Sequence, residues 1–208
     1  MTDTAAPLLL NLDGYTPLPP GKIAGIVTML EMTAPPPPLP ERATEGLTLE
    51  RMTAPDVAWY RALFRRVGED WLWFSRLRMS DTELAAILNS PEVEVLVLRK
   101  DGVEAGYIEL DGREPGEIEL AFVGLVPEMV GSGAGRFMMN RALARAWERQ
   151  PRRVHVHTCT HDKQGALNFY LKAGFRPYAS AVEIVDDPRL KGLLARTAAP
   201  HVPVMEAD

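Results

Sequence analysis

One stretch, residues 117–136, constrains this chain more than any other. Over 117–126 apolar residues alternate with more polar ones before the run turns apolar throughout, which predicts a buried strand. Pro127 ends the strand because it has no backbone N–H for a ladder. Three glycines then occupy alternate positions: Gly131, Gly133 and Gly135. Residues 136–147 have the pattern of a helix, so the stretch predicts an anion site, since the first N–H groups of a helix lack partners.

Two common phosphate loops do not match this stretch. A Walker loop needs Gly-Lys-Ser/Thr, but Gly135 is followed by Arg136 and Phe137. The dinucleotide fingerprint G-x-G-x-x-G fails because its third glycine would fall at Arg136 or Met138. The remaining interpretations are a different diphosphate loop, held through backbone N–H groups, or only a tight turn between strand and helix.

A third phosphate-loop pattern fits. Residues 130–135, Val-Gly-Ser-Gly-Ala-Gly, resemble the Q/R-x-x-G-x-G/A loop of the GNAT superfamily of acyl-CoA-dependent N-acyltransferases. Residues 166–175, Ala-Leu-Asn-Phe-Tyr-Leu-Lys-Ala-Gly-Phe, resemble the family's A-x-x-x-Y-x-K-x-G-F segment. The motifs stand in the family's order, and the resemblance covers roughly 47–185. Two positions depart from it: Val130 replaces the usual Gln or Arg, and Lys163 replaces an Asn that in many members helps to hold the pantetheine arm.

The resemblance implies an α/β (α+β) GNAT fold, a mixed and mostly antiparallel central sheet with helices on both faces, splayed at the acyl-CoA site. We expect a proline-rich N-terminal extension at 1–46, the acyltransferase domain at 47–185 and a C-terminal tail, partly disordered, at 186–208. The extension contains a run of four prolines that favours a stiff polyproline II spacer. Its apolar segment 22–32 favours a strand that packs on the domain or pairs with a partner subunit.

Shorter signals predict the other elements. A capping box at Thr53 and Asp56 begins a helix that Gly68 ends, and a better one at Ser80 and Glu83 begins a second helix. Asp101-Gly102 predicts a hairpin turn. We expect strands at 47–52, 93–99, 103–110, 117–126, 153–158 and 175–185. Two further positions have expected local roles: a bulge at Gly124, and the N-cap of a helix over 163–173 at Asp162.

The resemblance also implies that acetyl-CoA is the acyl donor. Backbone groups at the end of the splayed strand would pair with its pantetheine arm, and the glycine loop would hold its diphosphate. The residues expected to bind the donor are Leu125, Val126, Val130, Gly131, Ser132, Gly133, Ala134, Gly135, Arg136, Lys163, Ala166 and Tyr170.

Acyl transfer to an amine requires that the amine lose a proton and the leaving thiolate gain one. The resemblance implies Glu119 as the base, directly or through water, and Tyr170 as the acid; Glu109 or Glu117 are alternative bases. The competing interpretations are a surface carboxylate at 119 and a core tyrosine at 170. The residues expected to contact the acceptor, a primary amine on a small molecule or a peptide, are Trp71, Trp73, Glu109 and His157.

Composition limits the other classes of function. The metal argument rests on spacing along one expected strand, where alternate positions hold His155, His157, Cys159 and His161. Same-face neighbours on a strand lie about 6.6 Å apart, which is too far for one zinc site, so we expect no metal.

A net charge of −5 argues against nucleic-acid binding. No apolar run approaches the roughly 20 residues of a membrane span. One cysteine, and a start at 1–4 without basic residues, predict a cytoplasmic protein.

Three functions therefore compete. The first is an acetyl-CoA-dependent N-acetyltransferase. The second is an acyl-CoA-binding or regulatory GNAT-fold module without turnover, which the Val130 departure favours. The third is an interaction protein that acts through its proline-rich arm. A homodimer is compatible with each of them.

Overall fold

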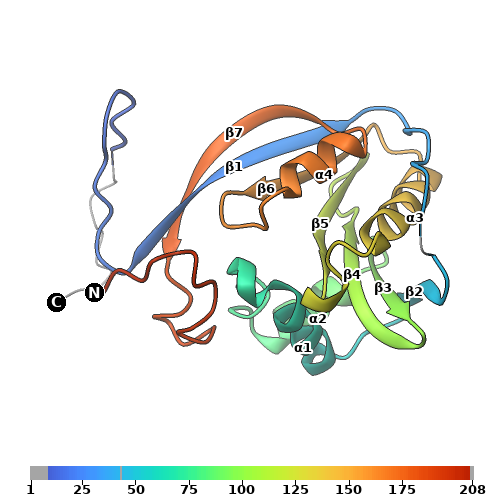
Figure 1. Cartoon of the computed structure of the whole chain (residues 1–208), viewed down its shortest axis with the longest axis horizontal. Coiled ribbons are helices and arrows are strands. Elements are labelled where there is room, and N and C mark those ends of the chain that lie inside the picture. The colour runs from blue at the N-terminus through green and yellow to red at the C-terminus, as the bar shows by residue number, and fades with distance from the viewer. Residues whose placement is uncertain (1–8, 43, 207–208) are drawn as a thin grey trace.

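The structure is a computed structural model that describes residues 9–42 and 44–206; residues 1–4 lie outside this range. Within the described residues, seven strands form one sheet in the order β2-β3-β4-β5-β6-β1-β7 (Figure 1). The strands are β1 (Lys22–Met32), β2 (Leu47–Met52), β3 (Val93–Lys100), β4 (Val103–Asp111), β5 (Glu117–Leu125), β6 (Arg153–Cys159) and β7 (Arg176–Asp186). The helices are α1 (Val57–Gly68), α2 (Asp81–Leu88), α3 (Ala134–Glu148) and α4 (Ala166–Lys172), with short 3-10 turns η1 (Glu69–Trp71) and η2 (Pro127–Met129).

Two apolar layers enclose the sheet and confirm the expected fold class. Helices α3 and α4 pack with side chains such as Leu96 and Leu98 of β3 on one face. Helices α1 and α2 pack with Val95 and Val97 of the same strand on the other face. Because β3 is buried on both faces, its sequence is nearly continuous in apolar residues rather than alternating.

The sheet opens between β5 and β6, as the resemblance implied. Of the described strand pairs, only this one is parallel, and its pairing runs only from Glu117 with Arg153 to Glu119 with His155. Both strands continue beyond these pairs, to Leu125 and Cys159. The backbone groups on the β6-facing edge of β5 after Glu119 therefore have no ladder partner among the described strands.

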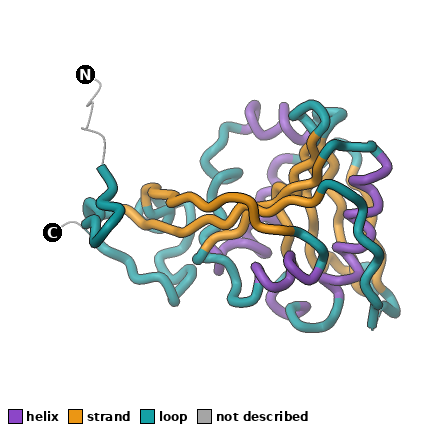
Figure 2. The backbone as a smooth tube through the Cα atoms, turned by 90° about the horizontal axis from the view of Figure 1, so that it is seen from above, coloured by secondary structure: helices purple, strands orange, loops and turns teal. Residues whose placement is uncertain are grey.

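The apolar segment of the N-terminal extension lies inside the sheet. Strand β1 pairs antiparallel with β6 on one side and with β7 on the other. Leu30 of β1 is fully buried in the core under α3 and α4. Strands β1 and β7 run out together from the body as a two-stranded arm (Figure 2). Of the two partners left open from the sequence, the segment thus pairs within its own chain.

The described part of the C-terminal segment, residues 186–206, is packed. Arg189 is 3% exposed, and its Nη2 lies 2.7 Å from Oδ2 of the buried Asp187. Nη1 of Arg189 donates to the carbonyl oxygens of Ala198 at 3.1 Å and Val202 at 2.8 Å. Up to residue 206 these bonds close the segment into a loop, and its residues Leu194, Ala198 and Ala199 pack with the α1 side chains. The described part is therefore ordered, contrary to the expectation, because bonds of this kind leave no periodic pattern in the sequence.

The structure corrects two local predictions: the residue that caps α1 and the position of the bulge in β5. The N-cap of α1 is Asp56, not Thr53, whereas Ser80 and Glu83 form the full capping box expected. The extra residue of β5 is Ala121, because Glu109 pairs with Phe122 and Leu110 with Leu120; Gly124 is regularly paired. No helix in the described part of the chain is both long and apolar enough to cross a membrane.

Gly124 has a packing role instead. A Cβ at this position would lie 2.2 Å from Cγ1 of Val67 and 3.1 Å from Cη2 of Trp73. The glycine therefore allows α1 and the Trp73 ring to approach β5 closely, which shapes the wall of the opening between β5 and β6.

Candidate active site

A cavity of about 850 Å³ fills the opening between β5 and β6. Its walls come from both separated strands, the glycine loop before α3, the segment before α4, the turn after η1 and the arm strands β1 and β7. The donor-site residues expected from the sequence that line it are Leu125, Val130, Gly131, Gly133, Gly135, Arg136, Lys163, Ala166 and Tyr170. The structure therefore gathers both motifs, which are separated by about 30 residues in the chain, around one cavity.

The glycine loop begins α3 earlier than expected. The helix starts at Ala134, with Gly133 as its N-cap at φ +95°, and Gly131 has φ +87°. These two values favour glycine, whereas Gly135 lies in the first helical turn with an ordinary φ. Among the described residues, no acceptor is found for the N–H groups of Gly131, Gly133 and Gly135. The loop thus presents free donors at a helix N-terminus beside an open cavity, which fits a bound diphosphate.

Three expected donor residues do not line the cavity. Val126 is buried, and its N–H donates to the carbonyl of Ala105 at 3.0 Å. Ala134 is buried under the loop, and its N–H donates to Oγ of Ser132 at 3.3 Å. The Ser132 hydroxyl donates to the Met129 carbonyl at 2.7 Å. The hydrogen bond of Val126 thus fixes the end of β5, while the hydrogen bonds of Ser132 and Ala134 stabilise the conformation of the glycine loop.

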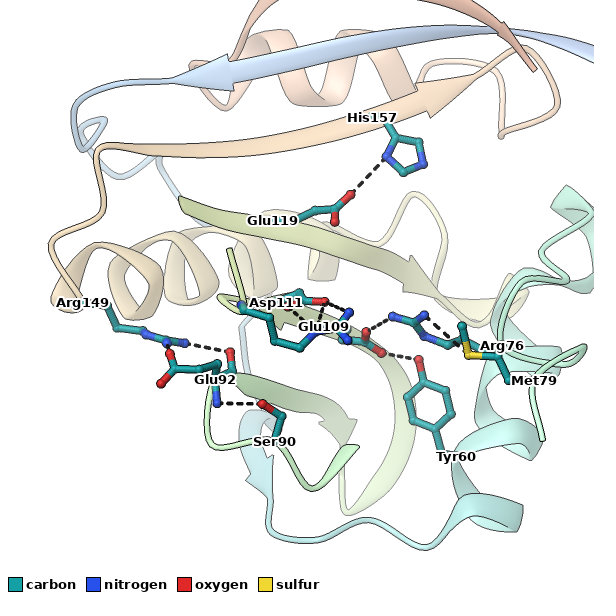
Figure 3. Close-up of polar contacts among 11 residues, drawn as sticks. Tyr60, Arg76, Met79, Ser90, Glu92, Glu109, Asp111, Glu119, Arg149 and His157 are labelled. Carbon is teal, nitrogen blue, oxygen red and sulfur yellow. Dashed lines mark hydrogen bonds and ion pairs between the residues drawn. The ribbon is translucent and has the colours of Figure 1, made fainter. Parts of the chain in front are cut away.

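Glu119 and His157 face each other across the opening (Figure 3). Nδ1 of His157 lies 3.3 Å from Oε1 of Glu119. This hydrogen bond lowers the pKa of the Glu119 carboxyl and raises the pKa of the His157 imidazole. His157 is about half exposed and Glu119 about one third, so the pair is reached by solvent and by a ligand in the cavity.

Glu109 does not reach the cavity. It is fully buried, with Oε1 lying 2.5 Å from Nη2 of Arg76 and Oε2 accepting from the hydroxyl of Tyr60. Figure 3 shows this cluster on β4 and the α1 side, apart from Glu119. Burial, together with the Glu109 charge, raises the pKa of Tyr60 well above its ordinary range. Glu109 thus balances the charge of Arg76, whose guanidinium lies 5.0 Å from the centre of the Phe122 ring at the cavity wall.

Tyr170 lines the cavity from α4 while most of its ring is packed in the core. It is 7% exposed and lies edge-on to Phe169 and Phe175, with ring centres 5.6 and 6.0 Å away. Burial, and secondarily the charge of Asp162, raise the pKa of its phenol. The hydroxyl therefore stays protonated at neutral pH.

Asp162 does not cap a helix as expected; its carboxylate joins the end of β6 to Trp73 through hydrogen bonds. Its Oδ2 accepts from the Thr158 hydroxyl at 2.6 Å and from the Cys159 N–H at 2.8 Å, and its Oδ1 accepts from Nε1 of Trp73 at 3.3 Å. Helix α4 instead begins after Gly165, at φ +98°. Asp162 thereby joins the end of β6 to the expected acceptor residue Trp73, which, like Trp71, lines the cavity.

Histidine and cysteine side chains also line the cavity: His157 and Cys159 come from β6, and His161 comes from the turn after it. Burial raises the pKa of the Cys159 thiol and lowers the pKa of His161. In the ranges 9–42 and 44–206, no three His, Cys, Asp or Glu side chains come together as metal ligands.

Several lining residues had no signal in the local sequence. Arg42 comes from the N-terminal segment, and Ile23, Glu183 and Val185 come from the β1–β7 arm. Each of these residues reaches the cavity through sheet pairing or packing over a long sequence distance, so no local pattern could predict its place there. Phe74 differs from these residues, because it belongs to the aromatic cluster of Trp71 and Trp73 from which pocket-lining residues were expected, and it lines the cavity as well.

Comparison of this chain with known proteins identifies its family. The acetyltransferase (GNAT) family model matches residues 57–175, more than half of the chain, and the chain belongs to this family. Uncharacterized N-acetyltransferases of Mycobacterium bovis and Mycobacterium tuberculosis are each 31% identical over 103 residues, which cover 50% of this chain. The match spans 65% of those relatives, less than two thirds of their length.

Solved structures share the fold. A GCN5-related N-acetyltransferase from Sphaerobacter thermophilus has a TM-score of 0.56 at 17% identity, with 78% of this chain and 52% of that chain covered. An aminoglycoside acetyltransferase from an uncultured soil sample has a TM-score of 0.53 at 16% identity, with 64% and 90% covered. At these identities the likeness concerns the fold alone.

Proposed function

We propose that this protein is an N-acyltransferase that moves an acetyl group from acetyl-CoA to a primary amine by direct attack. The observation that carries the proposal is that the unpaired edge of β5, the glycine loop before α3 and Tyr170 of α4 all border one cavity. The free N–H groups of the loop fit the donor's diphosphate, and the edge of β5 fits the amide-rich pantetheine arm.

The reaction forms one C–N bond and breaks one C–S bond. The amine nitrogen attacks the thioester carbonyl carbon, Glu119 takes the proton that the nitrogen loses, directly or through water, and the thiolate leaves. Tyr170 donates its phenolic proton to that thiolate, which its burial keeps available at neutral pH. His157 orients Glu119 through the 3.3 Å contact.

The acceptor side of the cavity favours a cationic or amphipathic amine. Glu119 and Glu183 contribute negative charge to its wall, while Trp71 and Trp73 contribute aromatic surface. The positive charge of Arg76 is balanced by Glu109, so it does not oppose a cation. An ammonium group is attracted both to carboxylates and to aromatic faces.

Calorimetric titration with acetyl-CoA tests the donor directly. The absence of binding at millimolar acetyl-CoA would exclude it as the acyl donor. Release of the CoA thiol in the presence of a panel of amines then tests turnover. We expect binding in the first experiment and amine-dependent thiol release in the second.

The runner-up is an acyl-CoA-binding or regulatory module without turnover. Two observations favour it: Val130 offers the loop no side-chain donor, and the lowered pKa of Glu119 makes that carboxylate a weaker base. Tight acetyl-CoA binding with no thiol release across amines of different size and charge would support this alternative over the enzyme.

A further inference from the structure

The proline-rich segment lies along α3 instead of standing free. The side-chain amide of Asn140 holds the backbone of Leu39 from both sides: Oδ1 accepts its N–H at 3.1 Å and Nδ2 donates to its carbonyl at 2.8 Å. Nη1 of Arg136 donates to the Pro40 carbonyl at 2.9 Å. At the other end, Cβ of Pro36 lies 3.2 Å from where a Cβ of Gly174 would stand. Contacts with α3 and with the turn after α4 therefore fix the segment.

This path brings Arg42 to the glycine loop. Its carbonyl oxygen lies 3.2 Å from the position that a Cβ of Gly133 would occupy, and Arg42 lines the cavity together with Gly131 and Gly133. Gly133 is the N-cap of α3, so Arg42 lies beside the loop whose N–H groups of Gly131, Gly133 and Gly135 have no acceptor among the described residues.

The charges around Arg42 leave it available for an anion. The neighbouring Glu41 is turned to α3, where its Oε1 lies 2.6 Å from Nη1 of Arg141 and accepts from Asn140 at 2.9 Å. No hydrogen bond or ion pair joins the Arg42 guanidinium to another residue in the described ranges. Arg136 is already engaged with Pro40, and Val130 supplies no charge.

We propose that Arg42 binds the diphosphate of the acyl donor, and that the Asn140 clamp on Leu39 positions it there. The inference rests on the proposed donor. The segment before the first family motif thereby completes the phosphate site, with a guanidinium added to the main-chain donors of the loop.

The test compares CoA with dephospho-CoA, which keeps the diphosphate and lacks the 3′-phosphate. Arg42→Ala should weaken both ligands by a similar factor, about five- to tenfold, as expected for one exposed charge-assisted contact. Arg42→Lys should recover part of the loss. Arg65→Ala, a surface arginine of α1 outside the cavity, is the matched control and should change neither affinity.

A double-mutant cycle tests the clamp. Asn140→Ala should weaken CoA binding in the wild-type background and have little further effect once Arg42 is alanine, since it acts through that residue. A merely structural role for Asn140 would lower the affinity equally in both backgrounds.

The possible failures are distinguishable. If the wild-type protein binds neither ligand, the proposed donor fails and the role of Arg42 falls with it. If the wild-type protein binds CoA but Arg42→Ala stays within twofold, only this inference is overturned. A loss confined to CoA, with dephospho-CoA unaffected, also overturns it, because the anion would then be the 3′-phosphate.

Discussion

Nδ1 of His157 lies 3.3 Å from Oε1 of Glu119 at the point where the parallel strands β5 and β6 stop pairing. Glu119 belongs to the last pair of that ladder, and His157 stands two residues beyond the pairing partner, His155. The two side chains therefore meet inside the opening rather than across a closed sheet. Their bond couples a candidate base to an imidazole whose pKa the bond raises.

Replacing His157 with alanine should move the pKa of Glu119. The lowered value depends first on the hydrogen bond from His157, so its loss should raise the pKa toward the ordinary 4.5. A carbon-detected NMR titration of glutamate carboxyls measures this shift directly. An unchanged Glu119 titration in a folded variant would show that the bond is absent in solution.

The same pair predicts a pH dependence of stability. The lowered pKa of Glu119 contributes stability above 4.5, which is lost as the pH falls through the folded value. The raised pKa of His157 contributes stability below 6.5, which is lost as the pH rises through the folded value. The free energy of unfolding of wild type minus that of His157→Ala should therefore be largest between pH 4.5 and 6.5. Because the imidazole is half exposed, the difference should be below about 1 kcal/mol, and urea unfolding across this range measures it.

Gly133→Glu should abolish donor binding. The position has φ +95°, and the new side chain would add bulk and negative charge where the loop offers its N–H groups. Calorimetry with acetyl-CoA measures the loss. Gly192→Glu is the matched control, since Gly192 has φ +70°, has nothing within 4 Å of an added Cβ and lies outside the cavity. Wild-type affinity in a folded Gly133→Glu protein would contradict the placement of the diphosphate.

Tyr170→Phe should lower turnover more than donor affinity. The ring stays in the core, and only the hydroxyl that would protonate the thiolate is lost; general-acid catalysis contributes about 10²- to 10⁴-fold. Steady-state kinetics and calorimetry on the same protein separate the two effects. Tyr178→Phe, on the exposed part of β7, serves as the control. Equal turnover in both variants would remove Tyr170 as the acid.

Leu30→Ala should destabilise the fold by about 2–5 kcal/mol, because the side chain is fully buried beneath α3 and α4. Ile26→Ala on the same strand should cost little, since Ile26 is 51% exposed. Urea unfolding compares the two. Similar stabilities would mean that β1 is not held in the sheet in solution.

Arg189→Ala should also destabilise strongly, by about 3–5 kcal/mol, because it leaves the buried Asp187 carboxylate without its partner. The exposed ion pair of Arg196 with Glu206 provides the comparison, and Arg196→Ala should cost below about 1 kcal/mol. An equal, small effect of both changes would show that the C-terminal loop is not closed in solution.

The sequence by itself determined the elements whose chemistry is local. Asp101 and Gly102 adopt positive φ in the hairpin turn, Ser80 and Glu83 cap α2, and Gly131 and Gly133 bend the chain into α3. Each outcome depends on the conformational preferences of residues within a few positions, so a pattern could predict it. The two family motifs, at 130–135 and 166–175, then indicated the phosphate loop before α3 and the helix α4 that carries Tyr170.

Only the tertiary structure decided which distant groups share the cavity. Pairing between strands far apart in the chain placed β1 between β6 and β7, and burial turned Glu109 to Arg76 rather than to the opening. The Asn140 clamp brought Arg42 to the glycine loop across about 100 residues of sequence. Such contacts are selected by packing and charge balance over the whole fold, and they leave no period or spacing in the chain from which they could be predicted.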